Sequence, residues 1–157
     1  MKRVGLFLAT ISMVFLLTAC GGKEKKLDCN LSMEENGVTV NQNFLWSFEG
    51  NGKFKSAILT QEAIVSEDVL KIQSLDEYKK NFETIIKSQY KNIDKLDYTI
   101  ATEGDNKVVV KLNFKDIDSV ATLTGKTNAK ASKKDFENIK KLYDNNSTGY
   151  KYTCTVK

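Results

Sequence analysis

The sequence contains no histidine and no proline among its 157 residues, and its only arginine is Arg3. Without histidine, neither a Ser-His-Asp triad nor an imidazole metal ligand can be built. The scarcity of arginine removes the side chain that most often binds phosphate, carboxylate or guanine through two parallel hydrogen bonds. These absences disfavour the familiar hydrolase, zinc-binding and nucleic-acid-binding classes.

The first residues are organised like a bacterial lipoprotein signal. A basic start at residues 1–3 precedes an apolar run at residues 4–16 that is short for a transmembrane helix. The sequence LTAC at residues 17–20 matches a lipobox, in which small residues fit the peptidase cleft and the cysteine sulfur carries a diacylglyceryl group. We predict a signal peptide over residues 1–19 and lipidation of Cys20; the alternatives are an ordinary signal peptide and a short anchor helix.

The predicted lipid sets the location of the protein. Because two acyl chains hold a protein on a membrane more firmly than one, we expect anchoring to the bacterial cell membrane through Cys20, on the extracytoplasmic face. Residues 20–26 are then the lipidated cysteine and a polar tether, and residues 27–157 form a single domain. Removing Lys2 and Arg3 with the signal lowers the net charge from +4 to +2, and acids separate the remaining lysines. We therefore expect no nucleic-acid partner.

The two other cysteines, Cys29 and Cys154, lie near the two ends of the mature chain. Apolar residues alternate around each of them, so both are expected to face the core. An extracytoplasmic location permits disulfides, and a bond between them would close a large loop. We predict a Cys29–Cys154 disulfide that brings the first and last strands together; the alternative is a pair of buried free thiols.

The pattern of apolar residues predicts strands separated by two main helices. Strands are expected near residues 27–31 and over residues 38–49, 54–65, 96–100, 108–114 and 150–156, with a bulge where the apolar phase of 54–65 shifts. One helix follows Ser74, whose capping box includes Glu77, and runs to Ile93; a second follows Ser132. A short helical turn is expected before Gly125. This order predicts an α+β fold: an antiparallel β-sheet with two main α-helices packed on one face.

Several segments together resemble the YehR-like family of small bacterial lipoproteins. They are the lipobox LTAC, the hairpin segment FEGNGKFKSAILTQEAIV, the segment YKNIDKLDYTIATEGDNKVVVKLNFKDID that ends the long helix, and the LTG before the final helix. The resemblance covers most of the mature chain and is one of pattern and order. It implies a compact α+β domain without an established activity and supplies no catalytic residues. The cysteine pair at positions 29 and 154 departs from the pattern of that family.

Few side chains are arranged as a catalytic or metal site. The carboxylate pairs are Glu67/Asp68, Glu103/Asp105 and Asp116/Asp118, which we interpret as solvated acids of turns, with calcium binding as the alternative for the last two pairs. No glycine-rich phosphate loop or nucleophile elbow is present, so we predict no cofactor, no metal site and no catalytic residues. Trp46, between Phe44 and Phe48 on one strand face, is interpreted as core, with a ligand pocket as the alternative.

Three hypotheses for the function follow. The first is a membrane-tethered, non-enzymatic domain that binds a small ligand, an envelope component or another protein. The second is an accessory or structural subunit of an envelope complex, which an exposed apolar patch would favour. The third is a hydrolase that uses two carboxylates, which a cleft with two close, buried acids would favour.

Overall fold

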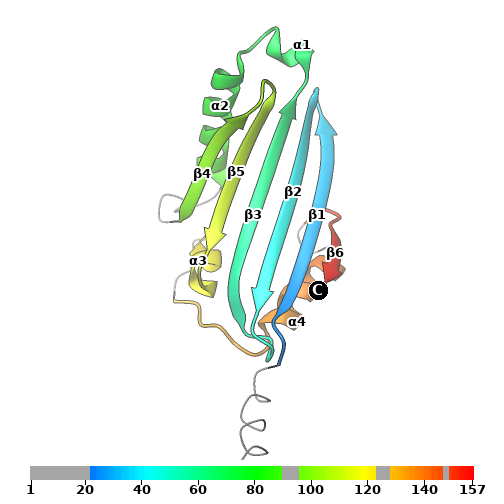
Figure 1. The fold of residues 1–157 in the computed structure, drawn as a ribbon, viewed down its shortest axis with the longest axis vertical. Coiled ribbons are helices and arrows are strands. Elements are labelled where there is room, and N and C mark those ends of the chain that lie inside the picture. The colour runs from blue at the N-terminus through cyan, green and yellow to red at the C-terminus, as the bar shows by residue number, and fades with distance from the viewer. Residues whose placement is uncertain (1–21, 90–95, 123–127, 147–148) are drawn as a thin grey trace, which may run out of the picture.

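The computed structural model describes residues 22–89, 96–122, 128–146 and 149–157. Within these ranges the chain forms six strands and four helices, a mixed α+β structure that is mostly sheet (Figure 1). The predicted signal peptide, Cys20, the expected helix end at Ile93 and Gly125 lie outside the described residues. Among the described helices, none is long and apolar enough to cross a bilayer.

The strands form one sheet in the order β4-β5-β3-β2-β1-β6, and every neighbouring pair is antiparallel. The strands are β1 (Lys25–Glu35), β2 (Val38–Phe48), β3 (Phe54–Val65), β4 (Asp97–Glu103), β5 (Lys107–Phe114) and β6 (Thr153–Val156). Strand β1 starts inside the stretch that was predicted as tether. The predicted α+β class with an antiparallel sheet is confirmed.

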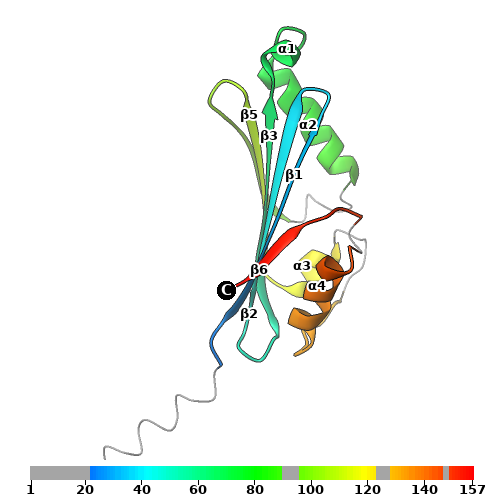
Figure 2. The same ribbon diagram turned by 90° about the vertical axis from the view of Figure 1, so that its right-hand side faces the viewer.

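The helices lie beside the two ends of this sheet. They are α1 (Glu67–Leu70), α2 (Leu75–Gln89), α3 (Ile117–Thr122) and α4 (Asp135–Asp144). Figure 2 shows α2 beside the end that carries the β1–β2 turn, and α3 and α4 beside the other end. The short helix α1, which begins after the N-cap Ser66, was not predicted.

Side chains alternate between two faces of the sheet, as the strand geometry requires. We call the buried side the core face and the other side the open face. The core face contributes Leu27, Cys29, Trp46, Phe48, Ala57, Leu59, Ala63, Val108, Val110, Leu112 and Phe114 to one cluster, which also includes Phe82 and Ile86 of α2 and Phe136, Ile139 and Tyr143 of α4. The open face carries mainly polar residues from the same strands.

The hairpin of β2 and β3 agrees closely with the prediction. Strand β3 has the predicted bounds, and β2 ends one residue earlier than expected. The expected bulge is present: Ser47 pairs with Ser56, whereas the next residue, Phe48, pairs with Phe54. The extra residue, Lys55, explains the shift of the apolar phase. Ile58 therefore lies on the open face, although Phe54, four positions earlier, lies on the core face.

Strand β6 pairs with β1, so the prediction that the first and last strands are neighbours is confirmed. Lys26 and Lys157 exchange both backbone hydrogen bonds, so the pair of Cys29 and Cys154 falls at a position without them, where opposed Cα atoms approach most closely. These Cα atoms are 4.1 Å apart and the two sulfurs are bonded. The strand is shorter than predicted, beginning at Thr153 rather than at residue 150.

The N-termini of the two longer helices differ in how they are capped. In α2 the predicted capping box is confirmed, since Glu77 accepts from the Ser74 backbone N–H and Ser74 accepts from that of Glu77. The predicted N-cap of α4 is wrong by two residues, because Lys134 takes that position. Ser132 nevertheless donates its backbone N–H to Asp135, at 2.8 Å.

The start of α4 is fixed to the β2–β3 turn. The buried carboxylate of Asp135 also accepts from the backbone N–H of Phe54 at 3.0 Å, and Phe136 N–H donates to Gly52 O at 3.0 Å. Gly52 has a φ of 91°, and a Cβ there would meet the Lys133 carbonyl oxygen at 2.6 Å. Asp135 is thus committed to a long-range contact, which explains why the helix begins there.

Removing the disulfide tests how much it stabilises this fold. We expect the double variant Cys29→Ser/Cys154→Ser to lose about 2–5 kcal/mol of unfolding free energy, because the bond restricts a long loop of the unfolded chain. Urea unfolding followed by tryptophan fluorescence measures the difference. The parent protein kept in reductant is the matched control and should show the same loss; equal stability of all three samples would contradict the prediction.

Candidate functional site

The open face contains a hollow of about 550 Å³ near the middle of strands β1, β2 and β3. It is lined by Asn30, Leu31, Ser32, Asn41, Gln42, Asn43, Thr60, Glu62 and Thr153. Amide and hydroxyl side chains dominate this lining, and Glu62 carries its only charge. The hollow is the candidate functional site.

The register of four strands assembles the hollow. Thr153, Asn30, Asn43 and Thr60 are consecutive partners across β6, β1, β2 and β3, so their side chains form one row on the open face. Two residues further along the strands, Ser32, Asn41 and Glu62 form a second row. Polar side chains from distant parts of the sequence thus lie side by side because the core-face residues between them are buried.

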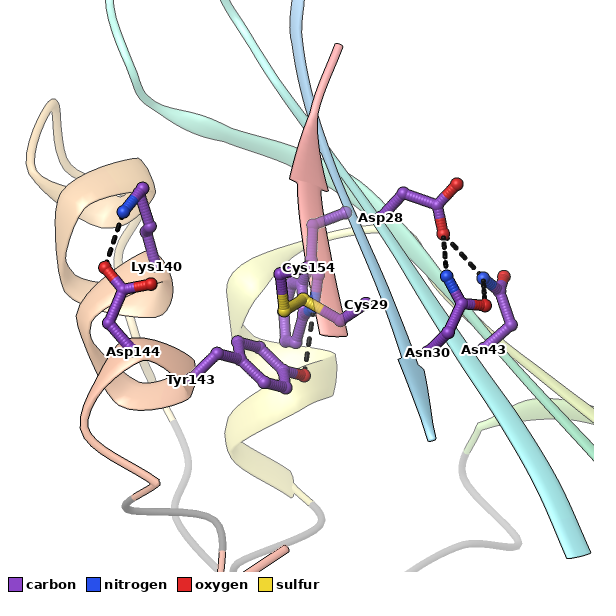
Figure 3. The surroundings of a disulfide bond; sticks show 9 residues. Asp28, Cys29, Asn30, Asn43, Lys140, Tyr143, Asp144 and Cys154 are labelled. Carbon is purple, nitrogen blue, oxygen red and sulfur yellow. Dashed lines mark hydrogen bonds and ion pairs between the residues drawn. A yellow bond between two sulfur atoms is a disulfide. The ribbon is translucent and has the colours of Figure 1, made fainter. Parts of the chain in front are cut away.

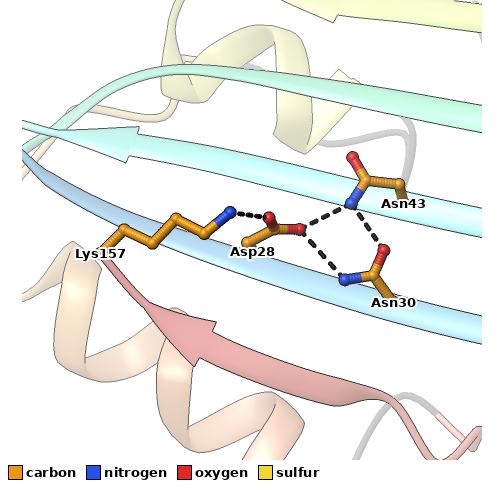
Figure 4. A network of polar contacts seen from close by, with 4 residues as sticks. All are labelled: Asp28, Asn30, Asn43 and Lys157. Carbon is orange, nitrogen blue, oxygen red and sulfur yellow. Dashed lines mark hydrogen bonds and ion pairs between the residues drawn. The ribbon is translucent and has the colours of Figure 1, made fainter.

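A hydrogen-bond network holds the first row in place (Figure 4). The Asn43 amide donates to Asp28 Oδ1 at 2.6 Å and to Asn30 Oδ1 at 2.8 Å, and the Asn30 amide donates to the same Asp28 oxygen at 3.1 Å. The other oxygen of Asp28 accepts from Lys157 Nζ at 2.5 Å. Asp28 therefore fixes both asparagines of the row in one orientation.

The charge of Asp28 is stabilised by these neighbours. The hydrogen bond from Lys157 lowers the pKa of the Asp28 carboxyl below its ordinary value and outweighs the opposing effect of burial, and the amides of Asn43 and Asn30 lower it further. The carboxylate is consequently ionised at neutral pH and accepts all of these hydrogen bonds.

Several polar atoms of the hollow have no hydrogen-bond partner among the described residues. Asn41 accepts from Ser32 Oγ at 2.7 Å, which leaves its amide nitrogen available. Asn43 uses its amide nitrogen, which leaves its oxygen available. The hydroxyls of Thr60 and Thr153 are available as both donors and acceptors. The site thus presents donors and acceptors together, which suits the hydroxyl groups of a neutral ligand.

Glu62, the charged residue of the lining, lies near a lysine that a second carboxylate also contacts. Lys107 Nζ lies 3.7 Å from Glu62 and 2.8 Å from Glu103. The hydrogen bond with Glu103 raises the pKa of Lys107 against the opposing effect of burial, and the charges of Glu103 and Glu62 raise it further. This one cation is shared between two carboxylates, so the border of the site keeps a negative charge.

The structure places the predicted carboxylate pairs apart from this hollow. Asp68 pairs with Lys71 on the exposed helix α1, and Glu103 pairs with Lys107 beside the β4–β5 turn. Asp116 accepts from Ser119 N–H at 2.7 Å and Asp118 accepts from Ala129 N–H at 2.7 Å, so both hold local backbone. Across the residues that the structure describes, no group of three or more His, Cys, Asp or Glu side chains is placed to hold a metal ion.

Trp46 belongs to the core, as interpreted from its neighbours in sequence. It is 5% exposed, stacks on Phe44 with ring centroids 4.1 Å apart, and donates its indole N–H to Tyr143 Oη at 3.1 Å. Figure 3 shows Tyr143 beside the Cys29–Cys154 disulfide, with Asp28, Asn30 and Asn43 on the other side of β1. The disulfide thus lies on the core face of β1, on the opposite side of the sheet from the hollow.

The residues of the hollow were not singled out in the sequence, although one signal was present. Asn41 and Asn43 alternate with the apolar residues of one strand, and Asn30 and Ser32 alternate with those of another. Pairing Cys29 with Phe44, as the structure does, places these four side chains together. The missing information was the register, which the side-chain pattern of one strand does not contain.

The chain matches no family model, no curated protein and no solved structure. The resemblance to the YehR-like lipoproteins and the lipidation of Cys20 remain predictions.

The network around Asp28 predicts a pH dependence of stability. Because the folded-state pKa of Asp28 is lowered, its contribution is present above the unfolded-state value of about 4 and is lost as the pH falls through the folded-state value. We expect Asp28→Asn to lower the unfolding free energy at pH 7 by about 1 kcal/mol and to flatten its decline in acid.

Urea unfolding at a series of pH values between neutrality and strong acid measures this. Asp105→Asn, on an exposed turn, is the matched control and should leave the profile unchanged. A profile of the Asp28 variant that is parallel to that of the parent would show that the network contributes no pH dependence.

Proposed function

We propose that the protein is a membrane-anchored, extracytoplasmic lipoprotein with a non-enzymatic binding function, and that the open-face hollow binds a neutral, hydroxyl-rich ligand such as an envelope glycan. The observation that carries this proposal is the row of Thr153, Asn30, Asn43 and Thr60, whose amides are held in place by Asp28. A site whose polar groups are fixed before binding loses little conformational entropy when a ligand arrives.

The chemistry of the lining supports a neutral ligand. The available groups are an amide nitrogen, an amide oxygen and two hydroxyls, which offer both donors and acceptors without a net charge. An anion would meet Glu62 in the lining, and the nearby Lys107 is already paired with carboxylates. Sugar hydroxyls donate and accept in the same way as these side chains, so they match the site group by group.

The fold part of the proposal is that the two main helices, α2 and α4, pack on one face of the sheet and leave the open face available to the ligand. In support, Phe82 and Ile86 of α2 and Phe136 and Ile139 of α4 are buried in the same cluster as the core-face residues. The YehR-like resemblance, with its lipoprotein signal, is part of the same proposal.

The anchoring part of the proposal concerns Cys20. We expect Cys20→Ala to abolish incorporation of labelled palmitate and to move the protein out of the membrane fraction, because no diacylglyceryl group can then be attached. Cys29→Ala is the matched control among the cysteines and should remain lipidated. Membrane retention of the Cys20 variant without label would contradict lipid anchoring.

The ligand part is tested at Thr60. We expect Thr60→Val, which replaces the hydroxyl by a methyl group of similar size, to weaken binding of a neutral oligosaccharide by about fivefold, the value of one hydrogen bond. The probe is a chitin oligosaccharide, and isothermal titration calorimetry gives the affinity.

Thr99→Val is the matched control, since Thr99 is an exposed threonine of the open face outside the hollow. It should bind the probe like the parent. Failure of the parent to bind any neutral oligosaccharide, or an equal loss in both variants, would contradict the proposed ligand class.

A further inference from the structure

The outer edge of β1 is covered along only part of its length. Strand β6 pairs with Leu27–Asn30, whereas residues 31–35 have no strand beside them on that edge among the described residues. In Figure 1 this uncovered part runs from β6 towards the β1–β2 turn. An uncovered strand edge presents backbone groups that a further strand can pair with.

The register identifies these groups. Lys26 exchanges its hydrogen bonds with Lys157 on β6, so the even-numbered residues of β1 direct their backbone N–H and C=O to the outer edge. Beyond the end of β6, Ser32 and Glu34 continue this series. Their backbone groups have no hydrogen-bond partner among the described residues, which leaves two donors and two acceptors on the edge.

The segment that precedes β6 is directed away from this edge. The Tyr152 hydroxyl donates to Gln42 Oε1 at 2.6 Å, and its ring packs edge-on against Tyr143 at 5.1 Å. Both contacts hold Tyr152 on the core face of the sheet, so the strand begins only at Thr153. These two contacts therefore keep Tyr152 and the residue before it from continuing β6 along the edge, which stays uncovered.

An apolar groove of about 520 Å³ borders the same edge on the core face. Its walls are Met33, Val38 and Val40 from the sheet and Tyr78 and Ile85 from α2. Ile85 is 48% exposed, although it belongs to the apolar stripe of the helix. Helix α2 packs mainly on β4 and β5, and its Tyr78 and Ile85 form the wall of the groove opposite the β1–β2 hairpin.

We propose that this edge and groove bind an extended, basic segment of a partner protein, which adds to the sheet as a strand antiparallel to β1. Its backbone pairs with Ser32 and Glu34, as in other complexes that form by strand addition. Because side chains alternate, the residue opposite Met33 enters the groove and is apolar. Glu34 and Glu35 also line the groove, which has no basic residue in its lining, so the partner residues opposite them are basic.

A second copy of this chain is a poorer occupant of the edge. Two β1 strands paired antiparallel around Met33 would place Glu34 and Glu35 of both copies around one short contact. The repulsion of four carboxylates opposes this arrangement, and it would also bring the β1–β2 turn of each copy against β6 of the other. Leu31 and Ser32 also line the open-face hollow, but the inference uses the outer backbone edge of β1 and does not depend on the ligand proposed for the hollow.

The proposal is tested with an acetylated and amidated peptide of sequence KKLTV. In antiparallel pairing its first residue lies opposite Glu35, its leucine opposite Met33 and its threonine opposite Ser32. The protein is expressed from its full sequence, labelled with ¹⁵N and kept in detergent micelles. We expect amide shifts confined to residues 31–35 and to the groove walls.

Two changes to the peptide separate strand addition from other binding. N-methylation of the second lysine and the threonine removes the N–H groups that pair with Glu34 and Ser32, and should abolish the shifts. The peptide EELTV tests charge and should bind at least about tenfold more weakly. Equal binding of the N-methylated peptide, absence of binding by KKLTV, or shifts only at the open-face hollow would each overturn the proposal.

A variant of the protein tests the wall of the groove that α2 forms. We expect Ile85→Lys to weaken binding of KKLTV about tenfold, since an apolar contact is lost and a like charge is added. Ile72→Lys, at a more exposed isoleucine outside the groove, is the matched control and should bind normally. Ser32→Pro removes an outward N–H of the edge together with the hydroxyl that donates to Asn41. If light scattering detects a dimer of the parent protein that this variant does not form, the proposal is overturned in favour of a second copy.

Discussion

The pairing of β1 with β2 is the constraint on which both faces of the sheet depend. Eleven consecutive residue pairs join the two strands without a break. Because side chains alternate, a slip of one residue would expose Leu27 and Cys29 and bury the charged Asp28, which would cost several kcal/mol. The burial of the apolar residues therefore fixes the register, and the register in turn brings Asn30 beside Asn43. The polar hollow exists because the residues behind it are buried.

Two glutamines on the core face connect the β2–β3 pairing to the residue before β6. Gln42 lies directly opposite Gln61 and donates to it at 3.1 Å, and Gln42 accepts from Tyr152. Buried amides are stable only when their hydrogen bonds are made, so this group specifies where Tyr152 must lie. The position of Tyr152 then decides where β6 begins and how much of β1 it covers. Gln42, which interrupts the apolar row of β2, thus determines how much of the β1 edge stays uncovered. This uncovered part is the edge that we propose binds a partner.

The sequence was sufficient where local pattern decides structure and insufficient where distant contacts decide it. Alternation located β3 with its bulge, and the Ser74–Glu77 capping box located the start of α2. The start of α4 depends on Asp135 accepting from the Phe54 backbone, a contact across 81 positions that no local pattern contains. The hollow was not predicted for the same reason, since its residues come from four strands. The disulfide was predictable because both cysteines occupied apolar positions of alternating segments.

The described chain begins with Gly22 lying directly against Gly50 of the β2–β3 turn, at the opposite end of the sheet from the β1–β2 turn. Strand β1, about 33 Å long, joins these ends. A pulling force between the first residues and a protein bound near the β1–β2 turn would act along this strand. Such a force would pass through the covalent backbone of β1 and would reach the partner through the hydrogen bonds at the uncovered edge, which would be sheared together. The disulfide joins β6 covalently to the same strand, so β6 would stay attached to β1 under such a force.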